Sequence, residues 1–251
     1  MSNLFLTIDL EEYFHSQFIR PYVKEKEARA YKYVELLLKK LNQYKAKSTF
    51  FIVSEWAEKN ESLLKQISYE GHEIASHTHT HPSLSLIKND MVFYELEKSK
   101  DILSTIINKN IKGFRSPNFD MPKKLFSYLQ QLNYVYDSSL CKSKIHMLSN
   151  NLIEENKNIK ELALESIIPP GGGFLRFIPI KLFEKLVFKK GQNCIVYIHP
   201  WELDDYSKIK NSVPTLKYFL HSYNINTVEK KLDYILNKFS SRNLQDLLEK
   251  K

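Results

Sequence analysis

The sequence has few cysteines and glycines and no long apolar run. Its 251 residues include two cysteines, Cys141 and Cys194, which excludes a disulfide framework and a C-x-x-C metal pair and fits a reducing compartment. No stretch approaches the roughly 18 consecutive apolar residues of a membrane span. A chain that is 43% hydrophobic, without repeats or low-complexity tracts, is expected to fold. We therefore predict a single α/β domain, 1–251, with a large core.

The chain is basic, with a formal net charge of +8. Such a balance suits nucleic acid, an anionic membrane surface or an anionic substrate. The lysines are scattered and no nucleic-acid-binding motif accompanies them, so we interpret most of them as solvated helix faces and predict no nucleic-acid partner. The first residues lack the basic and apolar regions of a signal peptide. We expect a cytoplasmic protein, with peripheral contact with the inner membrane as the further alternative.

Short apolar runs alternate with amphipathic stretches, which predicts a β/α repeat and a mainly parallel sheet with right-handed crossovers. The expected strands are 4–8, 48–53, 72–76, 112–115, 134–137 and 194–199. The expected helices are 28–44, 60–69, 90–108, 123–132 and 180–189. Residues 141–179 are interpreted as a long irregular surface excursion that ends in a hairpin or a loop tip.

The last part of the chain, 212–251, is expected to form a helical tail that packs on the domain. A helix is predicted from Asn226, with Asn226 as its N-cap and Glu229 at the third helical position. The predicted apolar stripe of this helix is formed by Leu232, Ile235, Leu236 and Phe239.

Polar residues stand where the predicted strands end. Five apolar runs end in a chemically capable side chain: Asp9, His77, Arg115, Asp137 and His199. In parallel α/β folds the active groups lie at the carboxyl ends of the strands. The positions of these five residues therefore predict one shared functional site.

The segment 76–82, Ser-His-Thr-His-Thr-His-Pro, places three histidines at alternate positions. Neutral imidazole is the commonest metal ligand near pH 7. A turn or short helix beginning at His77 would project His77 and His81 to one side and His79 elsewhere, whereas a strand would group all three. The alternative is a polar loop whose histidines contact only water.

Three carboxylates, Asp9, Glu11 and Glu12, follow the first apolar run. If the extended geometry persists, Asp9 and Glu11 share a face and Glu12 points away. One carboxylate would complete a two-histidine metal site of the kind that suits zinc or iron, and the other would take a proton from a metal-activated water. An acidic helix N-terminus is the alternative.

Arg115 and His199 have matching hypotheses. A buried Arg115 needs a carboxylate partner, either Asp9 or Asp137, and a structural salt bridge is the alternative. His199 ends a buried run and would protonate a leaving amine, held cationic by Asp137 if the two are adjacent. A histidine bonded to a backbone carbonyl is the alternative. Trp201 is expected to pack in the core or to face a sugar ring.

In combination, these residues resemble the polysaccharide deacetylases, the NodB-homology group in carbohydrate esterase family four. The segment 77–82, His-Thr-x-x-His-Pro, resembles the metal-binding motif, and 48–51, Ser-Thr-Phe-Phe, resembles a strand usually written Ala-Thr-Phe-Phe. Arg115-x-Pro117 matches the third motif, and His199 after an apolar strand matches the fifth. Segments 9–14, 171–176 and 199–204 resemble a subgroup found with bacterial exopolysaccharide and surface-glycan genes. The similarity runs from Leu4 to about Asp205.

The resemblance implies a distorted (β/α) barrel of about seven parallel strands. It also implies removal of N- or O-acetyl groups from sugars with one divalent metal ion, for which we predict Zn²⁺. Asp9 would be the general base, Arg115 would orient it, and His199 would be the general acid.

The metal ligands implied by the resemblance are His77, His81 and a nearby carboxylate. We choose Glu11 because it has the same strand parity as Asp9, with Glu12 as the alternative. Tyr197 stands where the family usually has a leucine that shapes the acetate pocket, and the aromatic expected after Asp137 is missing. The residues expected to contact the substrate are Tyr197, Trp201, Pro117, Gly172 and Gly173.

The predicted function is therefore a metal-dependent N-deacetylase acting on an acetylated amino sugar in bacterial surface-polysaccharide biosynthesis (O-antigen, capsule or exopolysaccharide). The substrate would be nucleotide-linked, lipid-linked or an oligosaccharide. One alternative is an amide hydrolase on the same scaffold that acts on another acyl group or a cyclic amide. The other is a catalytically inactive glycan-binding module.

Overall fold

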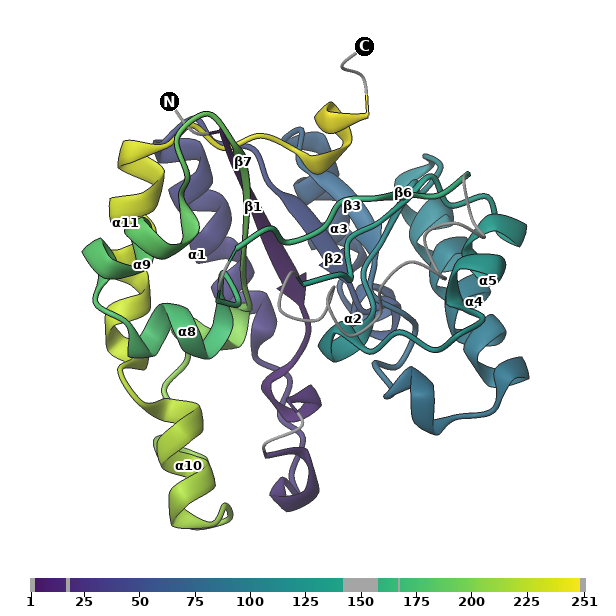
Figure 1. The fold of residues 1–251 in the computed structure, drawn as a ribbon. Helices are drawn as coiled ribbons and strands as arrows, with labels where there is room; N and C mark the ends of the chain where they lie inside the picture. Colours follow the sequence, from purple (N-terminus) through teal and green to yellow (C-terminus); the bar gives the residue numbers. More distant parts are fainter. Residues whose placement is uncertain (1–2, 17–18, 142–157, 167, 249–251) are drawn as a thin grey trace.

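The computed structural model of the chain describes residues 3–16, 19–141, 158–166 and 168–248. Within them, one sheet of seven strands has the order β6-β5-β4-β3-β2-β1-β7, and every neighbouring pair is parallel. The strands are β1 (Asn3–Leu10), β2 (Thr49–Ile52), β3 (Glu73–Ser76), β4 (Gly113–Phe114), β5 (Tyr136–Asp137), β6 (Lys160–Glu161) and β7 (Asn193–Ile198). The sheet curls into a distorted barrel that is open between β6 and β7, as predicted (Figure 1).

The helices surround this sheet. They are α1 (Ala30–Gln43), α2 (Ser54–Lys59), α3 (Glu61–Tyr69), α4 (Asn89–Ile107), α5 (Leu125–Gln131), α8 (Gly172–Phe177), α9 (Ile180–Val187), α10 (Thr215–Ser222) and α11 (Val228–Lys238). Figure 1 shows α1, α9 and α11 beside the β1–β7 end of the sheet and α4 and α5 beside the other end. Short 3₁₀ helices connect them: η1 (Tyr13–His15), η2 (Arg20–Tyr22), η3 (Leu84–Leu86), η4 (Pro117–Phe119), η5 (Pro200–Leu203), η6 (Ser207–Ile209), η7 (Ile225–Thr227) and η8 (Leu244–Leu247).

The core explains why apolar runs became strands. All four residues of β2 are buried, as are seven of the eight residues of β1. Because a parallel sheet is covered on both faces, its strands are nearly continuous apolar runs rather than alternating ones. The predicted strands and helices are confirmed, with ends that differ by a few residues, and the predicted helix 60–69 is preceded by a separate short helix, α2.

Two expectations about the second half of the chain are wrong. The excursion 141–179 contains β6 and α8 rather than only irregular structure, and 142–157 and 167 lie outside the described residues. Asn226 does not cap a helix, because it lies inside η7, and α11 begins at Val228. The stripe of α11 is correct: Leu232, Ile235 and Leu236 are buried in the main core. In the described part of the chain, no helix is long and apolar enough to cross a membrane.

Candidate active site

The polar residues at the strand ends meet around one cavity of about 650 Å³. Asp9 lies in β1 and Glu11 follows it, while His77 follows β3 and His199 follows β7. Asp9, Glu11, His77, His81 and His199 all line the cavity. Parallel strands bring their carboxyl ends to the same edge. Of the five strand-end residues expected to share a site, Asp9, His77 and His199 line this cavity, whereas Arg115 and Asp137 do not.

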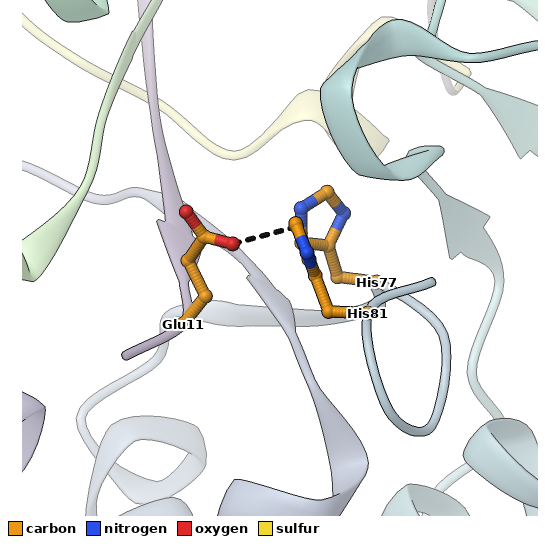
Figure 2. A group of neighbouring side chains, drawn as sticks. All are labelled: Glu11, His77 and His81. Atoms are coloured by element: carbon orange, nitrogen blue, oxygen red, sulfur yellow. Dashed lines mark ion pairs between the residues drawn. The ribbon is translucent and has the colours of Figure 1, made fainter. Parts of the chain in front are cut away.

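Glu11, His77 and His81 form a buried group whose ligand atoms lie within 4.8 Å of one another. Figure 2 shows the three side chains converging, with Glu11 Oε2 2.6 Å from His81 Nε2. His77 Nδ1 lies 2.8 Å from the backbone oxygen of Arg115. A ring nitrogen that donates to a carbonyl leaves the opposite nitrogen of the neutral ring as an electron-pair donor.

The protonation of these residues suits ligation. Burial lowers the pKa of His77 to about 4, so the ring is neutral at pH 7. Burial alone would raise the pKa of Glu11, but the charge and close contact of His81, with the charge of His199, lower it below its ordinary value. The site thus offers the neutral ring of His77 and the ionised carboxylate of Glu11, with the ring of His81 in contact with that carboxylate.

A divalent metal fits this donor set. His81 Nδ1 is buried and forms no hydrogen bond with any described residue, and the one partner of buried Glu11 Oε2 among the described residues is the ring of His81 itself. Buried polar atoms are nearly always hydrogen-bonded, so an atom without a hydrogen bond requires an explanation. A role as a metal ligand is such an explanation. Two histidines and a carboxylate form a common catalytic zinc set that leaves positions open.

A turn, not a helix, brings the two histidine rings together. Thr78 and His81 have positive φ angles of 68° and 57°, and the His81 amide donates to Thr78 Oγ1 at 3.1 Å. The ring centroids of His77 and His81 are 5.0 Å apart. His79 points elsewhere, as expected, and its Nδ1 lies 2.9 Å from Ser54 Oγ. All three histidines are buried, so the alternative of a water-exposed loop is wrong.

A buried carboxylate that sequence analysis missed holds this turn. Glu95 on α4 accepts hydrogen bonds from the backbone amides of His79 and Thr80, both at 2.8 Å. It also accepts one from the Thr80 hydroxyl at 2.7 Å. The strained turn is therefore fixed from a helix that begins several residues later, and no local motif announces that contact.

The carboxylate partner of Arg115 is Asp9. The guanidinium is fully buried, and its Nη1 donates to Asp9 Oδ1 and to Thr7 Oγ1, both at 2.7 Å. Its Nε and Nη2 donate to the Ser138 backbone oxygen and hydroxyl, both at 3.0 Å. The Cζ atom of Arg115 lies 4.1 Å from the centroid of the Phe51 ring, over its face. These contacts fix the Asp9 carboxylate at the edge of the cavity, while Arg115 itself does not line it.

Asp137 is not the partner of His199. It accepts hydrogen bonds from the Ser139 hydroxyl and amide at 2.8 and 2.9 Å, and it does not line the cavity. In the sheet, β5 and β7 are separated by β4, β3, β2 and β1, which is the physical reason for the error. The expected catalytic contact of Asp137 is therefore wrong.

The carboxylate beside His199 is Glu202, which sequence analysis missed. His199 Nδ1 lies 3.2 Å from Glu202 Oε2. Burial lowers the pKa of His199, but the hydrogen bond and charge of Glu202, with the charges of Glu11 and Asp9, outweigh it and raise that pKa. Glu202 is fully buried and lies 3.2 Å from Arg176 Nε. The His-x-x-Glu spacing of a capping box was the available signal.

Glu12 is not a third metal ligand. Its oxygens accept the backbone amides of Arg29, at 2.9 Å, and Ala30, at 3.1 Å, where α1 begins. The favourable interaction of a carboxylate with a helix N-terminus accounts for this position. Strand parity therefore separated Glu11 from Glu12 correctly.

Four of the five expected substrate-contacting residues line the cavity. They are Tyr197, Trp201, Gly172 and Gly173, whereas Pro117 does not line it and its neighbours Asn118 and Phe119 do. The glycine run is not a loop tip: Gly172 has a φ of 51° and begins α8. A Cβ on Gly171 would lie 1.9 Å from the backbone oxygen of Tyr197 in β7. Only glycine therefore fits at position 171, where the chain passes close to that strand.

Comparison with known proteins agrees with this geometry. Residues 28–136 match the family described as polysaccharide deacetylase. This part of the chain, somewhat less than half of it, is therefore similar to polysaccharide deacetylases. Residues 131–249 match a second family, described as a domain of unknown function, DUF3473. The two matches overlap at 131–136 and together span residues 28–249.

The proteins to which this chain is similar include carbohydrate deacetylases. A peptidoglycan-N-acetylglucosamine deacetylase of Bacillus cereus is 31% identical over 99 residues, 39% of this chain and 36% of that protein. A chitooligosaccharide deacetylase of Sinorhizobium fredii is 30% identical over 78 residues, 31% of this chain and 36% of that protein. The matched part is thus about a third of the length of these relatives.

Solved structures share the fold. A candidate polysaccharide deacetylase from Mycobacterium smegmatis superposes with a TM-score of 0.65 at 14% identity, over 99% of this chain and 90% of that one. A family-four pseudoenzyme from Bacillus anthracis gives 0.58 at 15% identity, over 99% and 66%. At such identities the likeness establishes the fold alone.

Trp201 contacts the site in a way that the sequence did not indicate. Its indole Nε1 donates to Glu11 Oε1 at 2.9 Å. Its ring stacks on His199, at 4.5 Å between centroids, and on His221, at 4.8 Å. Trp201 therefore holds the carboxylate of the predicted ligand set while it forms part of the cavity wall.

Proposed function

We propose that this chain is a metal-dependent N-deacetylase that acts on an acetylated amino sugar in bacterial surface-polysaccharide biosynthesis. One observation carries the proposal: the Glu11–His77–His81 group and the side chains of Asp9 and His199 line the same cavity. The proposed substrate is a cytoplasmic nucleotide-linked or lipid-linked sugar, or an oligosaccharide.

The donor set supports one divalent ion, which we propose to be Zn²⁺, held by Glu11, His77 and His81. When bound, such an ion polarises an acyl carbonyl and lowers the pKa of a nearby water. The role of Trp201 is to hold Glu11 through the indole hydrogen bond. An outer partner of this kind orients a ligand and adjusts its affinity for the metal.

Asp9 is the proposed general base. The bond from Arg115 fixes Oδ1 of Asp9, and Asp9 lines the cavity. In this position Asp9 takes the proton of the water that attacks the acyl carbon. Arg115 acts through Asp9, because it lies behind the carboxylate and does not face the cavity.

His199 is the proposed general acid. Its contact with buried Glu202 favours the protonated ring, which is the form able to donate. As the carbon–nitrogen bond breaks, His199 gives its proton to the amine nitrogen, so that water and the amide become acetate and a free amino sugar. The aromatic wall formed by Trp201 and Tyr197 suits the apolar face of a sugar ring.

The test is to purify the protein, measure its metal by elemental analysis, and assay acetate release from acetylated amino-sugar oligomers and nucleotide sugars. Wild type is compared with His77→Ala, Asp9→Asn and the matched control His79→Gln, a histidine of the same turn that is not in the ligand group. We expect near-stoichiometric metal that is lost only in His77→Ala. We expect Asp9→Asn to keep its metal and to lose at least about 100-fold in kcat.

The alternatives predict other results. Metal binding with release of a different acyl group, or with opening of a cyclic amide, would establish the amide hydrolase in place of the deacetylase. Metal binding and glycan binding without hydrolysis of any substrate would establish an inactive module. A protein that takes up no metal under any reconstitution would refute the site itself.

A further inference from the structure

The helix α10 carries an exposed apolar stripe. Leu216, Phe219, Leu220 and Tyr223 follow the i, i+3, i+4, i+7 spacing of one helix face. Their side chains are 70%, 50%, 38% and 37% exposed. Such a stripe normally faces a core, and contiguous apolar surface left in water marks an interaction site.

The opposite side of α10 already has its core contacts. His221 is 2% exposed and stacks on Trp201, and Tyr218 packs against the cluster that contains Trp201 and Tyr206. The helix is therefore anchored to the domain by its other residues. The exposed stripe is an additional surface rather than a displaced core face.

Two residues of α8 extend this surface to the cavity. Phe174 and Phe177 are 42% and 41% exposed, and Phe177 stacks on Tyr223 at 5.0 Å between ring centroids. We define the α8–α10 patch as Phe174, Phe177, Leu216, Phe219, Leu220 and Tyr223. Figure 1 shows α8 beside the carboxyl end of β1, with α10 next to it. Three members of the patch, Phe174, Phe177 and Leu220, also line the catalytic cavity.

The charges around the patch have one sign. Segments 168–183 and 209–228, which contain both helices, include four basic residues and no aspartate or glutamate. Three of them, Lys181, Lys210 and Lys217, are not buried, whereas Arg176 is buried and lies 3.2 Å from Glu202. An apolar face flanked by lysines is the composition of helices that lie in the interface of an anionic membrane. A second copy of the same patch would instead bring like charges together.

We propose that the α8–α10 patch docks the protein on the surface of an anionic lipid bilayer, with the mouth of the cavity at the head-group level. Apolar side chains enter the boundary between head groups and acyl chains, while the lysines contact anionic head groups. Continuity of the patch with the cavity places the site next to sugars carried by lipids in that membrane. This last consequence rests on the proposed deacetylase function, whereas the docking does not.

The test uses the full chain and vesicles of phosphatidylcholine with about 30% phosphatidylglycerol, compared with pure phosphatidylcholine. Sedimentation of wild type is measured beside the double variant Leu216→Ser/Phe219→Ser, whose residues do not line the cavity. The matched control is Leu86→Ser on η3, which removes an equally apolar side chain that is 85% exposed. All variants are checked by thermal unfolding.

We expect wild type and Leu86→Ser to bind the anionic vesicles more strongly than the neutral ones. We expect the double variant to bind at least about tenfold more weakly, because two apolar anchors are lost. Equal binding of wild type and the double variant, or no binding of wild type to anionic vesicles, would overturn the proposal. Dimers that form through the patch in the absence of vesicle binding would assign it to a second copy.

The outcome is separable from that of the deacetylase. The double variant should hydrolyse a soluble acetylated oligosaccharide at the wild-type rate if the chain is a deacetylase. Vesicle binding through the patch in a protein that releases no acetate from any substrate would refute the proposed function and leave the docking surface intact. Acetate release without vesicle binding would refute the docking surface and leave the proposed deacetylase function intact.

Discussion

Glu161→Gln should stabilise this protein at neutral pH, because a buried pair of carboxylates holds a proton there. Asp137 is fully buried and accepts two hydrogen bonds from Ser139. Glu161 Oε1 accepts the Leu140 amide at 3.2 Å, and Glu161 Oε2 is buried. Burial, and next the charge and hydrogen bond of Asp137, raise the pKa of Glu161 well above its ordinary value. The protonated form of Glu161 is therefore favoured, and in that form it can donate to Asp137.

The sign and size of the effect follow from proton linkage. In the unfolded chain the two carboxyls titrate near 3.8 and 4.5, so above pH 4.5 the folded pair binds one proton more than the unfolded pair. The pair's contribution to the free energy of unfolding then falls by about 1.4 kcal/mol per pH unit up to the folded pKa. The charge of Arg115 lowers the pKa of both carboxyls and so opposes the shift, but its donors bond to Asp9, Thr7 and Ser138.

The glutamine variant carries a permanent amide donor and does not titrate. Its stability advantage over wild type should therefore grow by about 1.4 kcal/mol for each pH unit above about 4.5, up to the folded pKa of the pair. Urea unfolding at several pH values measures this difference, with Glu165→Gln, an exposed carboxyl in the same segment, as the control that should run parallel to wild type. If Glu161→Gln also runs parallel to wild type, the shared proton does not exist.

Two further predictions concern the site and its support. Trp201→Phe, which removes the hydrogen bond to Glu11, should weaken metal binding about tenfold in a chelator competition assay; an unchanged affinity would show that the indole does not orient the ligand. Gly171→Ala should cost about 1–3 kcal/mol in thermal or urea unfolding, since its Cβ would meet the Tyr197 backbone oxygen at 1.9 Å. Gly173→Ala, where the nearest atom is 3.6 Å away, should change stability by less than about 0.5 kcal/mol, and equal losses in both variants would contradict the steric explanation.

The parts of the site that sequence predicts are those fixed by local geometry. Strand alternation places Glu11 and Glu12 on opposite faces. His77 and His81 are four residues apart, so their side chains point to the same side when the segment forms a turn. These relations span a few residues and depend on backbone period alone. The apolar runs of the strands likewise predict the sheet, because only strands buried on both faces are continuously apolar.

The parts that sequence does not predict depend on the order of the strands. Arg115 contacts Asp9 across β3 and β2. Asp137 is separated from His199 by four strands. In the sequence, however, Asp9 and Asp137 each follow an apolar run. Composition does not rank them. The partner of His199 is instead three residues away, because Pro200 begins a 3₁₀ turn that returns Glu202 to it. The local partner, Glu202, could have been predicted from its spacing to His199, whereas the predicted long-range partner, Asp137, was wrong.

The contacts of His221 have a thermodynamic consequence. Its ring, on the anchored side of α10, stacks on Trp201, and Trp201 donates to Glu11. The proposed membrane surface and the proposed metal ligand are thus two ends of one contiguous stack. Any factor by which docking changes metal affinity through this stack must equal the factor by which metal changes the partition onto vesicles. Titrating metal against vesicle binding would therefore measure the coupling free energy between the surface of the protein and its catalytic centre.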